Sequence, residues 1–122
     1  MKMVVLVGHC GPDNSYLKMA VSKAEKMTQV FSADDADELK HVLEEGVDLL
    51  LLNRELSWGF HESSGVELIR KLKDSHPTVK MMLVSNYPEA QAAAVAAGAL
   101  PGFGKRDIGS AKVGQILREA LG

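Results

Sequence analysis

The sequence predicts a single α/β domain built on a parallel sheet of five strands with helices on both faces. Short apolar runs alternate five times with longer segments whose apolar residues recur at helical spacing. The strongest run, residues 47–52, is almost wholly apolar, as is typical of a central strand buried on both faces. Because parallel strands need crossover connections, this alternation favours one sheet covered by helices on each side.

The first two strand–helix units lie before residue 47. A β-branched run that ends at Gly8 predicts the first strand, and Asp13 or Asn14 is placed to cap the helix after it. Residues 28–31 predict a second strand, and residues 32–35 open a helix that Gly46 ends. The apolar residues expected on the inner faces of these helices are Leu17, Ala20, Val21, Ala24, Leu39, Val42 and Leu43.

The central strand, residues 47–52, is followed by a loop over residues 54–64, which separates it from a helix over 65–75. A fourth strand is expected at residues 79–85, and Pro88 stands where the first turn of a helix tolerates proline. The alanine-rich helix over 89–97 ends at Gly98. A short fifth strand over 100–104 and a last helix over 108–121 complete the pattern.

Composition narrows the classes of function. With 122 residues, the chain is predicted to form one domain over 1–122, and its net charge of −2 provides no cationic field for nucleic acid or anionic lipid. The single cysteine, Cys10, cannot form an internal disulfide, which favours a reducing compartment. The apolar run near the N-terminus is too short for a signal peptide or a membrane span. We therefore expect a cytoplasmic protein.

Two segments carry a family resemblance: VDLLLLNREL, and GVELIRKLKDSHPTVKMMLVSNYPEAQAAAVAAGALPGFGKRD. In order, spacing and apolar pattern the chain resembles the receiver domains of bacterial two-component response regulators, the CheY-like family. The resemblance implies a flavodoxin-like sheet with strand order 2-1-3-4-5 and a site at the carboxyl ends of the strands. It also implies a role in phosphorelay signal transduction.

The resemblance places the site residues as follows. The family's phospho-accepting aspartate falls on Asn53, whose amide oxygen is a poor nucleophile and cannot form an acyl phosphate. Its Ser/Thr and its lysine fall on Ser85 and Lys105. The acidic pair that holds Mg²⁺ falls on His9 and Cys10, or on Gly8 and His9 in the neighbouring register. Imidazole and thiol suit Mg²⁺ poorly, so this is expected to be a pseudo-receiver with no cofactor.

Other positions depart from the family pattern. Arg106 stands where proline is usual, and Gly102 stands at the position of the switch aromatic, with Phe103 one residue later. The loop after Asn53 is longer than usual if Gly65 is the family's helix-opening glycine. The family's two-state readout is therefore not expected here.

Lys105 lacks the carboxylates that its family counterpart faces, and an unpartnered ammonium is costly to bury. We expect Lys105 to bond the Asn53 side-chain oxygen, to reach Glu55, to hold an anion or to turn to solvent. Phosphotransfer to Asp48 or Asp13 is a weaker alternative. Asp48 precedes the central strand, and no lysine or second carboxylate is predicted beside Asp13.

Soft-metal binding through His9, Cys10 and His61 is a further alternative, but no CxxC pair or helical His-x₃-His fixes a geometry. A redox role for Cys10 would need exposure and a lowered pKa. We expect no metal site. Signature motifs for phosphate loops, dinucleotide binding and serine hydrolases are absent, so no enzymatic activity is predicted.

Aromatic side chains mark candidate interaction residues. Trp58 and Phe60 either fold back and plug the vacated pocket or provide an exposed anchor for a partner. Phe103 is the third candidate residue. It belongs to the surface formed by the alanine-rich helix, the fifth strand and the last helix, through which receiver domains usually dimerise or contact effectors. The predicted partners are a signalling kinase, an output domain or another receiver.

The predicted function is thus that of a bacterial receiver-like signalling domain that acts by protein contact without being phosphorylated. The alternative is a sensor of a small molecule, an anion or a metal that uses the emptied pocket. Bound density among Asn53, Ser85, Lys105 and His9 would favour the sensor.

Overall fold

The computed structural model describes residues 1–122 and contains one five-stranded parallel sheet in the order β2-β1-β3-β4-β5. This confirms the predicted fold class and strand order. The strands are β1 (Lys2–Val7), β2 (Thr28–Ala33), β3 (Leu49–Asn53), β4 (Lys80–Val84) and β5 (Leu100–Phe103). The helices are α1 (Gly11–Ala24), α2 (Ala36–Glu45), α3 (Gly65–Ser75), α4 (Pro88–Ala97) and α5 (Ala111–Leu121), with a 3₁₀ turn, η1 (Lys105–Asp107), before α5.

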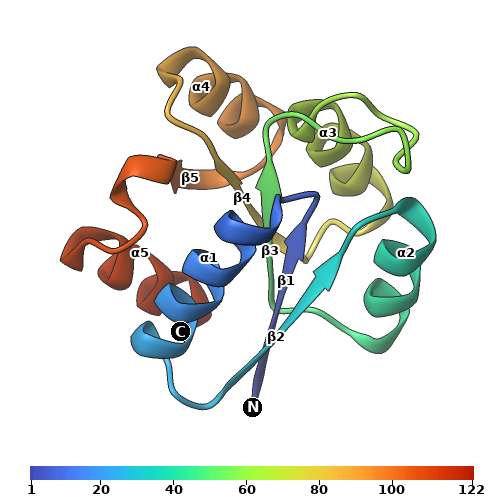
Figure 1. Ribbon diagram of the computed structural model, residues 1–122. Helices are drawn as coiled ribbons and strands as arrows, with labels where there is room; N and C mark the ends of the chain where they lie inside the picture. Colours follow the sequence, from blue (N-terminus) through green and yellow to red (C-terminus); the bar gives the residue numbers. More distant parts are fainter.

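Helices cover both faces of the sheet, as Figure 1 shows. Successive strand residues point to opposite faces, so Val4 and Leu6 pack with α1 and α5 on one side. Val5 and Val7 pack with α2, α3 and α4 on the other. The four leucines of β3 are fully buried, which explains why this segment is apolar on both of its faces.

Helix α1 begins earlier than predicted. The sequence predicts Asp13 or Asn14 as its cap, but the helix starts at Gly11, and Cys10 is its N-cap residue without a side-chain bond. The Asn14 N–H already donates to the Cys10 carbonyl oxygen at 2.9 Å. Pro12 explains the difference, because proline needs no backbone donor in the first turn and fits there. Asp13 is therefore a residue of the first turn of the helix.

Two other helices begin later than predicted. Ser32 and Ala33 were expected to open α2, but they pair with Leu6 and Val7 and extend β2, so the cap is Asp35. The last helix was expected from residue 108. It begins at Ala111, because η1 intervenes and Ser110 caps the helix by accepting from the Val113 N–H at 3.3 Å. The predicted helix over residues 65–75 is confirmed, with Ser64 as its cap.

Two glycines end helices as their sequence positions suggested. Gly46 follows α2 with φ 102°, and Gly98 follows α4 in the left-handed conformation with φ 118°. No helix combines the length and apolar character needed to cross a membrane.

Candidate functional site

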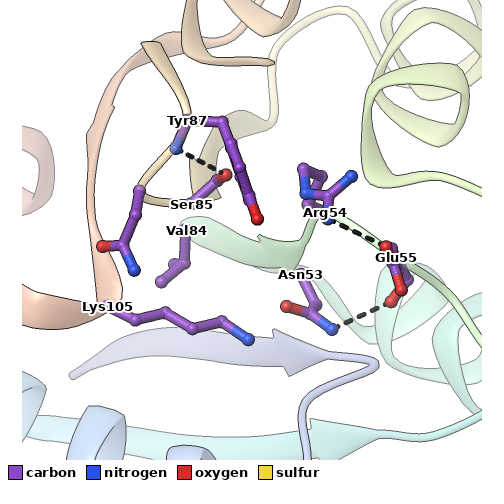
Figure 2. A pocket seen from close by; sticks show the side chains of 8 residues that line it. Asn53, Arg54, Glu55, Val84, Ser85, Tyr87 and Lys105 are labelled. Carbon is purple, nitrogen blue, oxygen red and sulfur yellow. Dashed lines mark hydrogen bonds and ion pairs between the residues drawn. The ribbon is translucent and has the colours of Figure 1, made fainter. Parts of the chain in front are cut away.

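The candidate site lies where four parallel strands end. Asn53 is the last residue of β3, Ser85 follows β4, Lys105 follows β5 by two residues and His9 follows β1 by two. A hollow of about 250 Å³ opens here, and in Figure 2 the Lys105 side chain extends toward Asn53. Its lining residues are Asn53, Arg54, Glu55, Val84, Ser85, Asn86, Tyr87 and Lys105. The topology thus brings three sequence-predicted site residues to one hollow.

The Asn53 side chain is held by its nitrogen. Nδ2 donates to the Gly8 carbonyl oxygen at 3.2 Å and to the Glu55 carbonyl oxygen at 2.9 Å. Two acceptors on the same atom fix the amide orientation, because the flipped amide would set oxygen against oxygen. The side-chain oxygen therefore lies on the side of Lys105, as Figure 2 shows. The amide bridges the loops after β1 and β3 as a double donor.

His9 is buried beneath this edge rather than exposed as a ligand. Its Nε2 bonds the Leu51 carbonyl oxygen at 2.8 Å, and because a carbonyl only accepts, Nε2 carries the proton. Nδ1 is buried without a partner. Burial lowers the pKa of His9, since the imidazolium would be desolvated there, and the Leu51 carbonyl only partly opposes this. The neutral imidazole is thus a structural support for β1 and β3.

The lowered pKa of His9 has a consequence for stability. A base with a folded-state pKa below its unfolded value takes up its proton more readily in the unfolded chain. Stability should therefore be unaffected above the unfolded pKa of about 6.5 and should fall as the pH drops below it. Replacing His9 with Gln keeps an amide donor for Leu51 and removes the titration. Urea unfolding from pH 8 to pH 5 should show a steeper loss of stability in the wild type than in His9→Gln, and parallel curves would contradict this.

Lys105 finds a partner that the sequence prediction missed. Its Nζ lies 3.0 Å from Asp13 Oδ2, with the two side chains 36% and 23% exposed. The four expected outcomes for Lys105 were a bond to Asn53, contact with Glu55, a bound anion or exposure to solvent, so this is a correction. Its cause is the early start of α1, which brings Asp13 into the first helical turn beside η1. The Lys105 ammonium, which bonds the Asp13 carboxylate, lowers the pKa of Asp13.

This ion pair gives a second titration test. Lys105→Met removes the charge and keeps the length, so the pKa of Asp13 should rise, because Lys105 is the largest cause of its lowering. A depressed carboxyl pKa stabilises the fold above the unfolded pKa, and that stability is lost as the pH falls through the folded pKa. For a partly exposed pair we expect a loss of about 0.5–1 kcal/mol at pH 7, and this loss should shrink as the pH falls through the lowered pKa of Asp13. Side-chain carboxyl NMR measures the pKa; an unchanged Asp13 titration would refute the pairing.

Ser85 and the residues after it form a compact wall of the hollow. The Ser85 side chain is buried, and its Oγ accepts from the Tyr87 N–H at 3.2 Å. Arg54 pairs with Glu55 at 2.8 Å and lies over the Tyr87 ring, 4.5 Å from its centroid. The Ser85 hydroxyl has no bond to His9 or Lys105, so it is not paired with a base in the way that hydrolases activate a serine.

Gln91 is a structural residue that sequence analysis overlooked. Its Nε2 approaches three backbone carbonyl oxygens, those of Leu83, Ser85 and Phe103, at 2.9–3.2 Å, and its Oε1 accepts from the Gly102 N–H at 3.3 Å. It therefore ties α4 to β4 and β5. Gln91 is the one amide residue in an alanine-rich helix, and this exception in the sequence is the feature that could have indicated its structural role.

Gly102 and Phe103 have structural reasons for their positions. A Cβ at Gly102 would overlap the Leu83 carbonyl oxygen, because β5 closes on β4 at a register shift between Met82 and Val84. No side chain fits where the family has its switch aromatic. Phe103, predicted as an interaction residue, is only 5% exposed and packs in the core between the sheet and α1 and α5. That assignment is corrected.

Arg106 fits its position by using a donor that proline lacks. Its backbone N–H donates to Asn86 Oδ1 at 3.1 Å, which fastens the turn after β5 to the loop after β4. Arg106 thus makes a backbone hydrogen bond that a proline at this position could not make.

The two aromatic residues in the loop after Asn53 differ in their exposure to solvent. Phe60 is buried, and its ring approaches Gly8 beside Leu56. It takes the inward alternative and is not available to a partner. Trp58 is 98% exposed and takes the outward one. The sequence left the burial of both residues open, and the structure buries Phe60, away from the hollow beside Asn53, and exposes Trp58.

The soft-metal alternative receives no support from the geometry. No group of three or more His, Cys, Asp or Glu side chains is placed to hold a metal ion, so His9, Cys10 and His61 do not converge. His61 lies in the loop beside Trp58, and Cys10 is exposed at the start of α1.

No family model matches the sequence, and no curated protein matches it. The fold, however, is similar to solved receiver domains. The signal receiver domain of a DNA-binding response regulator (merR) from Colwellia psychrerythraea 34H is 13% identical with a TM-score of 0.78, over 99% of this chain and 98% of that one. The beryllofluoride-activated NtrC4 receiver domain dimer is 18% identical with a TM-score of 0.79, over 99% and 97%.

A response regulator from Burkholderia pseudomallei with a phosphorylated aspartic acid, a calcium ion and citrate is 23% identical with a TM-score of 0.66. The similarity covers 100% of this chain and 67% of that one. At these identities the likeness establishes the fold, which is that of receiver domains.

Proposed function

We propose that this chain is an atypical receiver domain of two-component signalling that works through protein contacts and is not phosphorylated. The observation that carries the proposal is the state of Asn53. An amide stands where a receiver needs a carboxylate, and its nitrogen is engaged by the Gly8 and Glu55 carbonyl oxygens. Acyl phosphate formation requires a carboxylate oxygen that attacks phosphorus, and no such atom stands at this position.

The surrounding residues support the same proposal. Mg²⁺ prefers hard oxygen ligands in octahedral geometry, whereas the acidic pair falls on His9 with either Cys10 or Gly8, and none of these residues has a carboxylate. The nearby carboxylate of Asp13 is engaged by Lys105. The proposal therefore includes the loss of the magnesium site and of the autocatalytic phosphotransfer that depends on it, so the domain acts as a non-enzymatic pseudo-receiver.

The proposed partners are proteins of bacterial cytoplasmic signalling: a kinase, an output domain or another receiver. Helix α4 and strand β5 offer one apolar surface for such contacts. It is formed by exposed Ala92, Ala93, Val95, Ala96 and Leu100. Small side chains allow a partner helix to approach closely, which suits a homodimer through α4, β5 and α5 as well as an effector contact.

The second candidate function is a sensor of a small anion, since the hollow at the sheet edge carries two cationic side chains, Lys105 and Arg54. Both are already engaged, by Asp13 and by Glu55. An anion would have to compete with those carboxylates, so we rank this function second. Stabilisation of the wild type by millimolar phosphate, lost in Lys105→Met, would favour it.

The test of the first proposal is labelling with acetyl phosphate or phosphoramidate in the presence of Mg²⁺, read by intact mass. The wild type should show no added phosphoryl group under conditions that label an orthodox receiver. A stable adduct would overturn the proposal, and peptide mapping would then identify the accepting residue, with Asp13 and Asp48 as the first positions to inspect.

A further inference from the structure

Trp58 lies at the outer end of the loop between β3 and α3, and its side chain is 98% exposed. The loop itself is anchored. The Phe60 N–H donates to the Ser57 carbonyl oxygen at 3.1 Å, which closes a turn around Trp58, and the buried Phe60 ring fastens the turn to the sheet. Glu62 pairs with Lys71 of α3 at 3.3 Å on the other side. The backbone that carries the exposed indole is therefore anchored on both sides.

The same turn is fastened to the start of α2. The Ala36 N–H donates to the Gly59 carbonyl oxygen at 3.0 Å. A Cβ at Gly59 would lie 3.1 Å from Asp35 Cβ and 3.3 Å from the Asp34 carbonyl oxygen, so the loop and the helix start are in close contact. The backbone that carries Trp58 is thus held beside the acidic residues of this segment before any partner binds, so the loop need not be ordered on binding.

Four carboxylates fall within residues 34–38 at the start of α2, and all but Glu38 line a hollow with Trp58: Asp34, Asp35, Asp37 and Glu38. None of them belongs to any of the ion pairs in the structure. Asp35 caps α2 by accepting from the Glu38 N–H at 2.8 Å, and Glu38 accepts from the Asp34 N–H at 3.2 Å, so these two have structural roles. The side chains of Asp34 and Asp37 are exposed and have no hydrogen-bond role.

A hollow of about 410 Å³ joins the two features. Its lining includes Trp58, Gly59, His61 and the three aspartates, and contains no lysine or arginine. Helix capping accounts for Asp35, and favourable interaction with the helix N-terminus accounts in part for Asp37 and Glu38. Neither reason accounts for Asp34 or for a fully exposed tryptophan beside it.

We propose that Trp58, Asp34 and Asp37 form a docking surface for a basic segment of a partner protein. An arginine or lysine side chain would lie on the indole face, where the ring quadrupole attracts a cation, and its charge would face the two free carboxylates. Arginine suits this surface best, because its planar guanidinium can stack on the ring and bond a carboxylate in the same pose. The inference rests on the proposed role in protein contact and names the chemistry of the partner.

The test uses Trp58 as its own reporter, since it is the only tryptophan in the chain. Acetylated, amidated hexa-arginine peptide is titrated into the full chain, with a serine–glycine peptide of equal length as the neutral ligand. Indole emission should change saturably with the arginine peptide alone. Calorimetry on Trp58→Ala should show affinity weakened by about tenfold or more, as loss of a desolvated cation–π contact would give.

A matched pair of double variants separates local contact from overall charge. Asp34→Asn with Asp37→Asn and Glu44→Gln with Glu89→Gln each remove two exposed carboxylates, but only the first pair borders Trp58. The first should weaken binding about tenfold, and the second should leave it within about twofold. Equal weakening in both, or no saturable signal, would overturn the docking surface. So would dimerisation of the free chain that Trp58→Ala abolishes, because the occupant would then be a second copy.

The outcome is independent of the phosphorylation test. Failure of the peptide to bind leaves the Asn53 argument untouched, and a phosphoryl adduct on the wild type overturns the proposed function without changing the peptide affinity.

Discussion

Replacing Gly65 with alanine should lower the free energy of unfolding by about 2–3 kcal/mol, because the new methyl group has no space. Gly65 is the first residue of α3, and the helix enters directly against the carboxyl end of β3. A Cβ there would overlap the Asn53 carbonyl oxygen and lie 2.8 Å from Leu83 Cδ1. One of these atoms belongs to the backbone of the central strand, which cannot move without disturbing the site.

Gly11 is the matched control. It is also the first residue of a helix, α1, and nothing lies within 4 Å of a Cβ built on it. Gly11→Ala should cost less than about 1 kcal/mol, since the new methyl group meets no atom beyond its chain neighbours, and the helix preference of alanine offsets the restriction that Pro12 places on the residue before it. Urea unfolding at pH 7 gives both values. Equal losses in the two variants would mean that the close approach at Gly65 is not what limits the side chain.

Most of the fold could be predicted from the sequence because its strands are buried on both faces. A run such as Leu49–Leu52 is short and wholly apolar, which indicates a buried central strand, and the alternation with helical stripes then leaves few topologies. Boundaries were less accurate where local and long-range preferences compete. Ser32 and Ala33 suit the start of a helix by composition, yet their pairing with β1 makes them strand residues.

The candidate site was predictable only in part. Asn53, Ser85 and Lys105 could be placed together because each follows a parallel strand, and such ends share one edge of a sheet. The partner of Lys105 could not, since it depends on the turn at which α1 begins. The contacts of Gln91 were equally hidden, because a periodic pattern gives the face of a helix but not the carbonyl groups that its side chains reach.

Asn53→Asp tests whether the amide is required as a donor. The substitution removes both bonds from Nδ2 and sets carboxylate oxygens toward the Gly8 and Glu55 carbonyl oxygens, which lie 3.2 and 2.9 Å from the nitrogen in the wild type. Two acceptors lose their donor and a half-buried charge faces like partial charges. We expect a loss of about 2–3 kcal/mol in the free energy of unfolding at pH 7, part of which attraction to Lys105 offsets.

Asn86→Asp is the control because it makes the same chemical change at a side chain that acts as an acceptor, whereas Asn53 acts as a donor. Asn86 uses its oxygen, which accepts from the Arg106 N–H at 3.1 Å, and a carboxylate can accept that bond equally well. Its stability should stay within about 0.5 kcal/mol of the wild type in the same urea titration. If Asn53→Asp proves as stable as Asn86→Asp, the carbonyl pair does not select an amide, and the two bonds from Nδ2 are not what fixes the residue type at this position. If only Asn53→Asp is destabilised, the site is adapted to a neutral donor at the position where receivers carry their reactive carboxylate.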